Sequence, residues 1–375
     1  MIKIAFIITG LSRGGAERML IKLLKSIDRT RFAPKVFCLT NHLDLKPELD
    51  TLGVPVQSYR LNSPLFLMLH LIQFIKDCRV FSPDILQGWM YHGNILAWLA
   101  RLFTASKLVF GIRASLYDFT FERFRTRLVI RLGALLSKSA NKIIYVSQVA
   151  RGHHEGIGYA SNNTCVLANG FELDKFQPNE EYRQEYRSLM TILDQEVLIG
   201  YFARFHKLKG HLDLIQAFSQ VHRRFPKAKL ALAGLHLDES NVEIQNALHQ
   251  LKLKNHVLLL GNLSNPERIL PALDIFASPS HQEGFPNVVG EAMACQVPCV
   301  VTDVGDSALC VGNTGIVVPP MDIEQLTQGL CQMIQDPNRD SLGVRARERI
   351  KTEFALSAIV KKYEKVYDSI VTEIP

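Results

Sequence analysis

The sequence predicts an α/β protein with two doubly wound domains, each a parallel sheet covered by helices on both faces. Short β-branched runs alternate with longer helical patterns along the whole chain, as strand–helix–strand units require. The length of 375 residues, 47% of them hydrophobic, is enough for two domain cores. Strands are expected within residues 3–9, 35–39, 84–88, 107–112, 141–147, 164–170, 197–202, 229–234, 256–261, 273–280, 298–303 and 315–320.

The boundary between the two domains is predicted in residues 170–196, which are polar, highly charged and lack a strand pattern. We therefore expect domains at 1–175 and 176–355. Residues 356–375 carry apolar side chains at helical spacing, which predicts a closing helix that packs back on the first domain. Those side chains are Ile359, Val360, Tyr363, Val366 and Tyr367.

The sequence argues against a membrane-spanning, disulfide-linked or zinc-binding protein. Its most apolar stretch, residues 63–79, is interrupted by His70, Gln73 and Lys76, and so falls short of the roughly 20 apolar residues that span a bilayer. The first residues alternate like a strand and lead into a glycine loop, unlike a signal peptide, so we expect a cytoplasmic protein. The seven cysteines include no C-x-x-C pair and are expected to be buried thiols.

Charge is distributed unevenly. Residues 1–170 carry 22 Lys and Arg against 10 Asp and Glu, whereas residues 171–375 carry 21 against 26. A basic first half is typical of a protein that meets a membrane surface, a phosphorylated lipid or nucleic acid, although a solvated basic face gives the same pattern.

Within the basic half, residues 117–142 interleave cations with apolar side chains. The apolar members are Phe119, Phe121, Phe124, Leu128, Ile130 and Leu132, and the cations are Arg123, Arg125, Arg127, Arg131 and Lys138. Such a surface suits the boundary of an anionic membrane, and our hypothesis is that the first domain docks on the cytoplasmic membrane face. Nucleic acid is not expected as a partner, because no recognised nucleic-acid module accompanies the pattern.

Two loops that follow predicted strands have residues suited to binding an anion. After the first strand, Gly14 and Gly15 precede a helix whose N–H groups and dipole suit a phosphate or an acceptor group; a tight strand–helix turn is the alternative. The glycine spacing is not the dinucleotide pattern G-x-G-x-x-G. In the second half, Arg204, Lys209 and Gly210 stand between a strand and a helix, which is a geometry suited to a diphosphate.

Two carboxylates eight positions apart occur in "EGFPNVVGE", at Glu283 and Glu291. Pro286 and Asn287 favour a helix start, which places Glu283 in the preceding loop and Glu291 about one turn inside the helix. Carboxylates accept hydrogen bonds from hydroxyls, so the pair can hold two polyhydroxyl groups, such as a ribose and a hexose.

These segments together resemble the retaining GT-B glycosyltransferases of family 4. "EGFPNVVGE" is similar to the family's E-x7-E motif, "GLSRGGAER" to its N-terminal glycine loop, and "ARFHKLKG" to its R-x4-K-G segment. "ANGFELDKFQP" resembles the segment before the interdomain hinge, and "TDVGD…GNTGIVVPP" the closing loop. The resemblance implies two Rossmann-like domains that face each other across a cleft, with the nucleotide sugar on the second domain and the acceptor on the first.

The resemblance also implies roles for individual residues. Arg204 and Lys209 would neutralise the departing nucleotide diphosphate, and Glu291 would bind the ribose. Glu283 would face the donor sugar with the backbone N–H groups of Gly284, Phe285, Asn287 and Val288, and Gly15 would lie near the phosphates. No cofactor and no metal ion are expected.

The sequence departs from the family's pattern in one place. Many relatives have a histidine at the end of the strand written "KLVFGIRAS" here, where this chain has Arg113. Arg113 and His92 are therefore our candidates for the first-domain contact to the sugar. A histidine satisfied in the core is the alternative for His92.

We therefore expect a hexosyltransferase that uses a nucleotide sugar, UDP-linked by expectation, and a saccharide or lipid-linked acceptor in cell-surface polysaccharide synthesis. It would work on the inner face of the plasma membrane. The alternatives are a sugar-nucleotide epimerase of GT-B shape and a non-catalytic nucleotide-sugar-binding protein.

Overall fold

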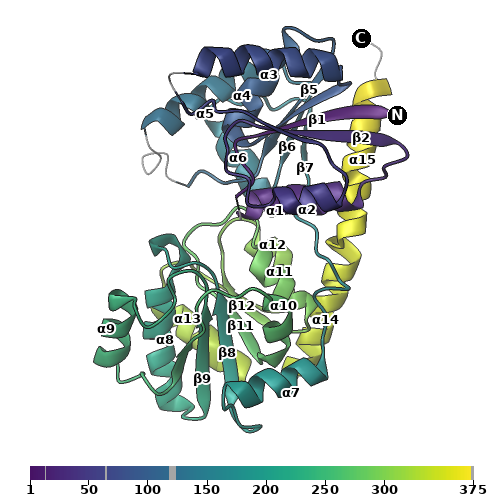
Figure 1. Cartoon of the computed structure of the whole chain (residues 1–375). Coiled ribbons are helices and arrows are strands. Elements are labelled where there is room, and N and C mark those ends of the chain that lie inside the picture. Colours follow the sequence, from purple (N-terminus) through teal and green to yellow (C-terminus); the bar gives the residue numbers. More distant parts are fainter. Residues whose placement is uncertain (13, 64–65, 118–123, 373–375) are drawn as a thin grey trace. The chain divides into compact units, whose positions relative to one another are not determined.

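The chain folds into two α/β units (Figure 1). The computed structural model describes residues 1–12, 14–63, 66–117 and 124–372. Unit 1 comprises residues 1–170 with 356–375, and unit 2 comprises residues 171–355. The division after Gly170 lies at the start of the polar segment that the sequence analysis assigns to the boundary.

Unit 1 is built on a parallel sheet of seven strands in the order β3-β2-β1-β4-β5-β6-β7. The register pairs Ile4 with both Pro34 and Ile85, so β1 lies between β2 and β4. The strands are β1 (Ile2–Ile8), β2 (Phe32–Cys38), β3 (Val56–Ser58), β4 (Ile85–Trp89), β5 (Lys107–Ile112), β6 (Lys142–Tyr145) and β7 (Thr164–Val166).

Helices cover both faces of this sheet, because the strands are apolar on both sides. One core contains side chains of α1, α2 and α15; the other contains side chains of α3, α4 and α5. His154 of α6 packs against this second core, through the rings of Tyr91 and Tyr145. The helices are α1 (Gly15–Ser26), α2 (Lys46–Thr51), α3 (Leu67–Phe81), α4 (Met90–Arg101), α5 (Phe124–Ser137), α6 (Gln148–Gly156) and α15 (Leu356–Thr372).

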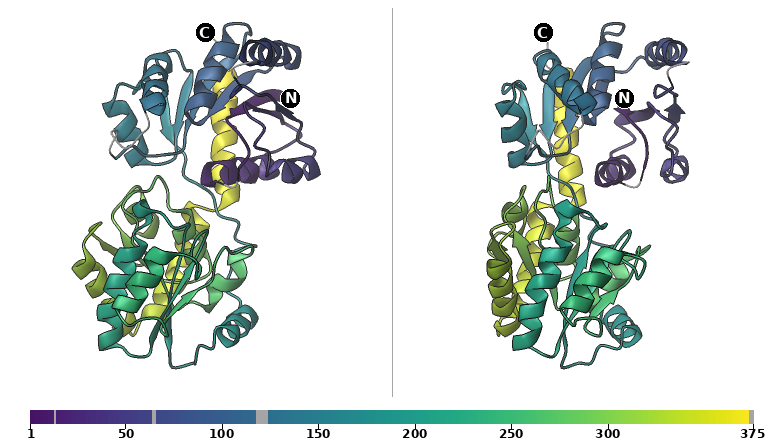
Figure 2. Two further views of the ribbon diagram at one scale, coloured as in Figure 1. Left: turned by 60° about the vertical axis from the view of Figure 1, so that its left-hand side comes forward. Right: turned by 90° about the vertical axis from the view of Figure 1, so that its left-hand side faces the viewer.

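The last helix, α15, packs against the sheet of unit 1 (yellow in Figure 2). Its buried face includes Ile359, Val360, Tyr363 and Tyr367. The hydroxyl of Tyr367 donates to Oε1 of Gln87 on β4 at 2.6 Å. A polar contact between two fully buried side chains fixes the helix more specifically than apolar packing alone.

Unit 2 repeats the arrangement with six parallel strands in the order β10-β9-β8-β11-β12-β13. The strands are β8 (Val197–Phe202), β9 (Ala228–Ala233), β10 (Val257–Leu259), β11 (Ile275–Ser278), β12 (Cys299–Thr302) and β13 (Ile316–Val318). The helices are α7 (Glu180–Leu189), α8 (His211–Arg224), α9 (Val242–Gln250), α10 (Pro266–Ile269), α11 (Asn287–Ala294), α12 (Ser307–Val311), α13 (Ile323–Gln335) and α14 (Arg339–Glu353). In Figure 1, α8, α9 and α13 flank one face of the sheet, and α10, α11, α12 and α14 flank the other.

The predicted fold class is confirmed, and every predicted strand is present. The prediction missed β3, which has only three half-exposed residues and so offers too short a pattern. The cysteines are free thiols, all buried except the half-buried Cys165, as expected. Within the described residues, no helix is both long and apolar enough to cross a membrane.

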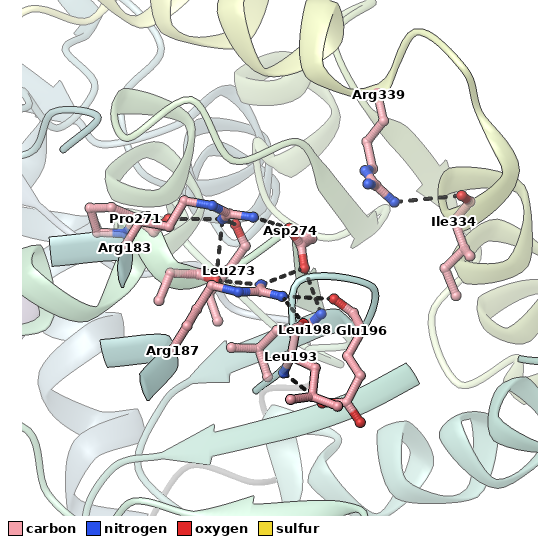
Figure 3. A network of polar contacts seen from close by, with 11 residues as sticks. Arg183, Arg187, Leu193, Glu196, Leu198, Pro271, Leu273, Asp274, Ile334 and Arg339 are labelled. Atoms are coloured by element: carbon pink, nitrogen blue, oxygen red, sulfur yellow. Dashed lines mark hydrogen bonds and ion pairs between the residues drawn. The ribbon is translucent and has the colours of Figure 1, made fainter. Parts of the chain in front are cut away.

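A buried ionic network attaches α7 to the strands of unit 2 (Figure 3). Arg183 and Arg187, one helical turn apart, donate to the two carboxylate oxygens of Asp274 at 2.5 and 2.9 Å. Asp274 also accepts from the backbone N–H of Leu198 at 2.7 Å, and Arg187 donates to the carbonyls of Leu193 and Glu196. The helix within the polar segment 170–196 is therefore part of unit 2.

We expect Asp274→Ala to destabilise unit 2 by about 3–5 kcal/mol, because it leaves the buried Arg187 guanidinium without its carboxylate. The side chains of Arg187 and Asp274 are only 8% and 9% exposed, so water cannot replace the lost contact. Hydrogen exchange of the β8 and β11 amides measures the change. Glu348→Ala, which breaks an exposed pair with Lys351, is the matched control and should have little effect. Equal exchange in both variants would contradict the prediction.

Candidate active site

The candidate site of unit 2 lies at the carboxyl ends of β8 and β11, two neighbouring strands after which the chain continues toward opposite edges of the sheet. β8 pairs with β11, and the chain continues from β8 to β9 on one side and from β11 to β12 on the other. In open α/β sheets, ligands bind at the carboxyl ends of the strands at this switch point. The loop with Arg204 and Lys209 follows β8, and the loop with Glu283 follows β11.

Gly210 brings these two loops together. It has a φ of +64°, which favours glycine, and a Cβ atom there would lie 2.2 Å from the carbonyl oxygen of Pro279. The short 3-10 turn Lys207–Lys209 therefore lies against the chain that leaves β11. This close approach places Lys209 beside Glu283.

Lys209 and Glu283 form an ion pair, with Nζ of Lys209 at 2.5 Å from Oε1 of Glu283. The side chains are 24% and 13% exposed, so each can still reach a ligand. Arg204 lies five residues before Lys209, is exposed, and contacts no carboxylate within the described part of the chain. The site thus offers one partly shielded ion pair and one further cation.

Helix α11 begins directly after this pair, as predicted. Asn287 is its first residue and Glu291 its fifth, and the residue at its N-cap position, Pro286, makes no side-chain hydrogen bond to the first turn. Val289, Ala292 and Met293 are buried, which holds the helix in place. The first-turn N–H groups and the positive end of the helix dipole therefore lie next to Glu283 in the chain.

The loop after β12 supports the Glu283 loop from the other side. Gly305 has a φ of +55°, and a Cβ atom there would lie 2.7 Å from the carbonyl oxygen of Glu283. Phe285 is buried, with its ring 5.5 Å from that of Phe354 and 6.2 Å from that of Phe171. Gly284, Val288 and Glu291 are half-buried. Most of the predicted donor-binding residues are neighbours in the sequence, and these contacts hold their loop and the first turns of α11 in place.

Unit 1 has its own switch point between β1 and β4. Gly15 is the exposed first residue of α1, after β1, and His92 is the third residue of α4, after β4. His92 is exposed, so the alternative of a histidine satisfied in the core is wrong. The predicted contacts of Gly15 and His92 with a donor stay predictions.

Arg113 has a structural role in unit 1. It is 9% exposed, and its guanidinium donates to the hydroxyl of Tyr363 at 2.7 Å and to Oδ1 of Asn169. It also lies 5.2 Å from the ring of Trp89. Arg113 therefore ties β5 to α15, and the predicted sugar contact remains a prediction beside this role.

Two polar contacts next to Glu283 were not predicted from the sequence. The hydroxyl of Ser280 donates to Oε1 of Glu283 at 2.8 Å. Nε2 of His281 lies 2.6 Å from Oδ2 of Asp213 and so links the Glu283 loop to the first turn of α8. A serine and a histidine in a loop carry no signal that separates them from ordinary solvated residues.

The arrangement can bind a ligand that is anionic at one end and rich in hydroxyls at the other. Arg204 and Lys209 supply positive charge, and Glu283 supplies a hydrogen-bond acceptor close by. Among the described residues, no three His, Cys, Asp or Glu side chains gather in a way that could hold a metal ion.

Comparison with known proteins identifies the family. A family model described as Glycosyltransferase Family 4 matches residues 13–175, and one described as Glycosyl transferases group 1 matches residues 196–336. The chain belongs to the GT-B glycosyltransferases of family 4. Both matched ranges carry the motifs described above, so this glycosyltransferase contains both halves of the family's fold.

Curated relatives match most of the chain. The glycosyltransferase is 28% identical over 290 residues to the capsular polysaccharide biosynthesis glycosyltransferase CapM of Staphylococcus aureus, covering 75% of this chain and 74% of that protein. It is 25% identical over 384 residues to an N,N'-diacetylbacillosaminyl-diphospho-undecaprenol alpha-1,3-N-acetylgalactosaminyltransferase of Campylobacter jejuni, covering 97% and 99%.

Solved structures share the fold. The Anabaena protein Alr3699/HepE, solved in complex with UDP and glucose, superposes with a TM-score of 0.86 at 22% identity and covers 98% of this chain and 100% of its own. The galactosyltransferase WaaB superposes with a TM-score of 0.75 at 17% identity, covering 98% and 99%. These likenesses establish the GT-B fold of the glycosyltransferase.

Proposed function

We propose that this glycosyltransferase moves a hexose or N-acetylhexosamine from a UDP-linked donor to a saccharide or lipid-linked acceptor, with retention of configuration and without a metal ion. The observation that carries the proposal is the Lys209–Glu283 ion pair, which directly precedes the first turn of α11 in the chain. Lys209 suits the diphosphate of a nucleotide sugar, and Glu283, 2.5 Å away, suits the hydroxyls of the attached sugar.

In the proposed reaction the bond between the anomeric carbon and the diphosphate oxygen breaks as the acceptor oxygen bonds to the same face of that carbon. The proton of the acceptor hydroxyl passes to the departing phosphate oxygen. Negative charge grows on the diphosphate while the sugar becomes oxocarbenium-like. Arg204, Lys209 and the α11 dipole stabilise the diphosphate, and fixed charges of this kind need little reorganisation in the transition state.

The positive charges of Arg204 and Lys209 are also the reason to propose that the reaction needs no metal ion. A divalent ion on a diphosphate neutralises its charge and draws electron density from the leaving oxygen. Arg204 and Lys209 supply positive charge for the same purpose from two sides of a short loop. We propose that they replace the ion.

The proposed donor and pathway draw on the proteins that this chain resembles. The Anabaena neighbour was solved with UDP-glucose, and other neighbours and relatives are named for UDP, capsular polysaccharide or undecaprenol-linked substrates. We propose a UDP-linked donor and a role in cell-surface polysaccharide synthesis on this ground. Glu291 is assigned to the ribose of the donor.

The acceptor is proposed to be reached at the inner face of the plasma membrane. On α5, four large apolar side chains are each at least 43% exposed, and they recur at helical spacing: Phe124, Leu128, Leu132 and Leu135. Arg125, Arg131 and Lys138 are exposed in the same segment. Phe119, Phe121 and Arg123 lie outside the described residues. Apolar side chains flanked by cations suit an anionic lipid surface.

A thermal-shift panel of UDP-, GDP- and ADP-sugars with and without EDTA tests the donor and the metal independence. We expect UDP-sugars to stabilise the wild-type protein equally with and without EDTA. Lys209→Ala should weaken donor binding roughly 10- to 100-fold, because it removes a charge-assisted contact to the diphosphate.

Lys207→Ala is the matched control, since Lys207 is an exposed lysine of the same turn. It should keep the wild-type response. Loss of the shift in EDTA would overturn metal independence, and a response to GDP-sugars alone would overturn the UDP assignment. No response to any nucleotide sugar would contradict the proposed function.

Sedimentation with liposomes tests the membrane surface. We expect binding to phosphatidylglycerol vesicles and none to phosphatidylcholine vesicles. Leu128→Ser with Leu135→Ser should reduce binding about tenfold or more, because two exposed apolar side chains leave the interface. Leu189→Ser, at an exposed leucine of α7 in unit 2, is the matched control. Equal sedimentation with both lipids would refute the proposal.

A further inference from the structure

Two fully buried hydroxyls lie behind Glu283. Tyr201 is the fifth residue of β8, and Ser280 follows β11 by two residues. Both have no exposed surface, and the hydroxyl oxygens of the two residues are 3.0 Å apart. Ser280 in turn contacts Oε1 of Glu283 at 2.8 Å. The three side chains form one continuous hydrogen-bonded row from the core of the sheet to the site.

The direction of each hydrogen bond in this row follows from counting protons. An ionised carboxylate only accepts, so Ser280 donates its single hydroxyl proton to Glu283. Ser280 must then accept from Tyr201. Burial, together with the charge of Glu283, raises the pKa of Tyr201, so its hydroxyl keeps the proton that it donates. The order is therefore Tyr201 to Ser280 to Glu283.

The row occupies only one oxygen of the carboxylate. Ser280 and Lys209 both donate to Oε1 of Glu283. Within the described chain, no donor contacts the other oxygen, Oε2. A half-buried carboxylate whose second oxygen keeps its lone pairs can accept a hydrogen bond from a ligand hydroxyl.

The row is anchored at its inner end. The ring of Tyr201 lies 4.9 Å from that of His211 and 6.1 Å from that of Phe276, both buried. The hydroxyl of Thr302, at the end of β12, donates to the carbonyl of Ser280 at 2.5 Å. These contacts hold the ring of Tyr201 and the backbone of Ser280 in place.

Lys209 cannot remain paired with Glu283 only, once a donor is bound. In the proposed function the diphosphate of the donor competes for the same ammonium group, and its two negative charges together attract that group more strongly than one carboxylate does. The Ser280 hydroxyl would then be the contact that keeps Glu283 in place.

We propose that Ser280 and Tyr201 are positioning residues that hold Glu283 with Oε2 directed to a hydroxyl of the donor sugar while Lys209 turns to the diphosphate. This deepens the proposed function and rests on it. It predicts that removal of either hydroxyl lowers the affinity for the UDP-sugar or its turnover, and leaves the affinity for UDP nearly unchanged.

Calorimetric titration of UDP and UDP-glucose into four variants tests this proposal, together with the rate of UDP release from UDP-glucose. The variants are Ser280→Ala, Tyr201→Phe, the double variant and Tyr145→Phe. Tyr145 is the matched control, because it is a fully buried tyrosine whose hydroxyl has no hydrogen-bond partner among the residues that the structure describes. UDP-N-acetylglucosamine replaces UDP-glucose if it is the donor that binds the wild-type protein.

We expect UDP affinity within about twofold of wild type in every variant. Ser280→Ala should lower UDP-sugar affinity or turnover about tenfold or more, since it removes a hydrogen bond to a charged group. Tyr201→Phe should lower the UDP-sugar affinity or turnover by a smaller factor. The double variant should be no worse than Ser280→Ala, because Tyr201 acts only through Ser280. Tyr145→Phe should match wild type.

Equal losses for UDP and UDP-sugar, or additive losses in the double variant, would overturn the positioning role and leave a merely structural one. Unchanged UDP-sugar binding and turnover in Ser280→Ala would overturn it as well. If Ser280→Ala does not fold, Ser280→Cys keeps a weak donor of similar size and should retain part of the wild-type turnover. A wild-type protein that binds no nucleotide sugar marks failure of the proposed function instead.

Discussion

The ion pair between Lys209 and Glu283 is the interaction on which this account of the molecule depends. It joins residues 74 positions apart in the sequence and connects the loops that follow two neighbouring strands. Gly210 permits the contact by approaching Pro279 closely, and Gly305 supports the Glu283 backbone from the opposite side. In the absence of a ligand the pair neutralises itself, which limits the cost of keeping two charges in a partly shielded site.

Arginines perform two different tasks in this chain. Arg113 in unit 1, and Arg183 and Arg187 in unit 2, are committed to carbonyls, a hydroxyl or a carboxylate of their own unit. Arg204 is exposed and makes no such contact within the described residues. Residue type therefore does not distinguish Arg204, for which we propose a role in ligand binding, from the arginines with a structural role. What distinguishes them is whether the guanidinium's hydrogen bonds are already taken up by the fold.

Local patterns were sufficient for much of the fold and for part of the site. β-Branched runs marked all but one strand, and Pro286 marked the start of α11, so the positions of Glu283 and Glu291 relative to the helix could be predicted. The contact between Lys209 and Glu283 could not be read from spacing, because it depends on which strands are neighbours. The role of Arg113 was missed for the same reason, since Tyr363 lies 250 residues further along the chain. Nothing in the sequence singled out Ser280 or Tyr201, because the role of a buried hydroxyl can be inferred only from the groups that it contacts.

The most direct measurement of the central claim is turnover of the charge-swapped variant that combines Lys209→Glu with Glu283→Lys. The swap keeps an ion pair between the same two loops but reverses which loop carries the cation. If Lys209 binds the diphosphate and Glu283 the sugar of the donor, the variant should stay folded, with a melting temperature near that of wild type, and should release no nucleotide from the donor. If the pair only joins the loops, the swapped variant will retain turnover, and that result would contradict the account.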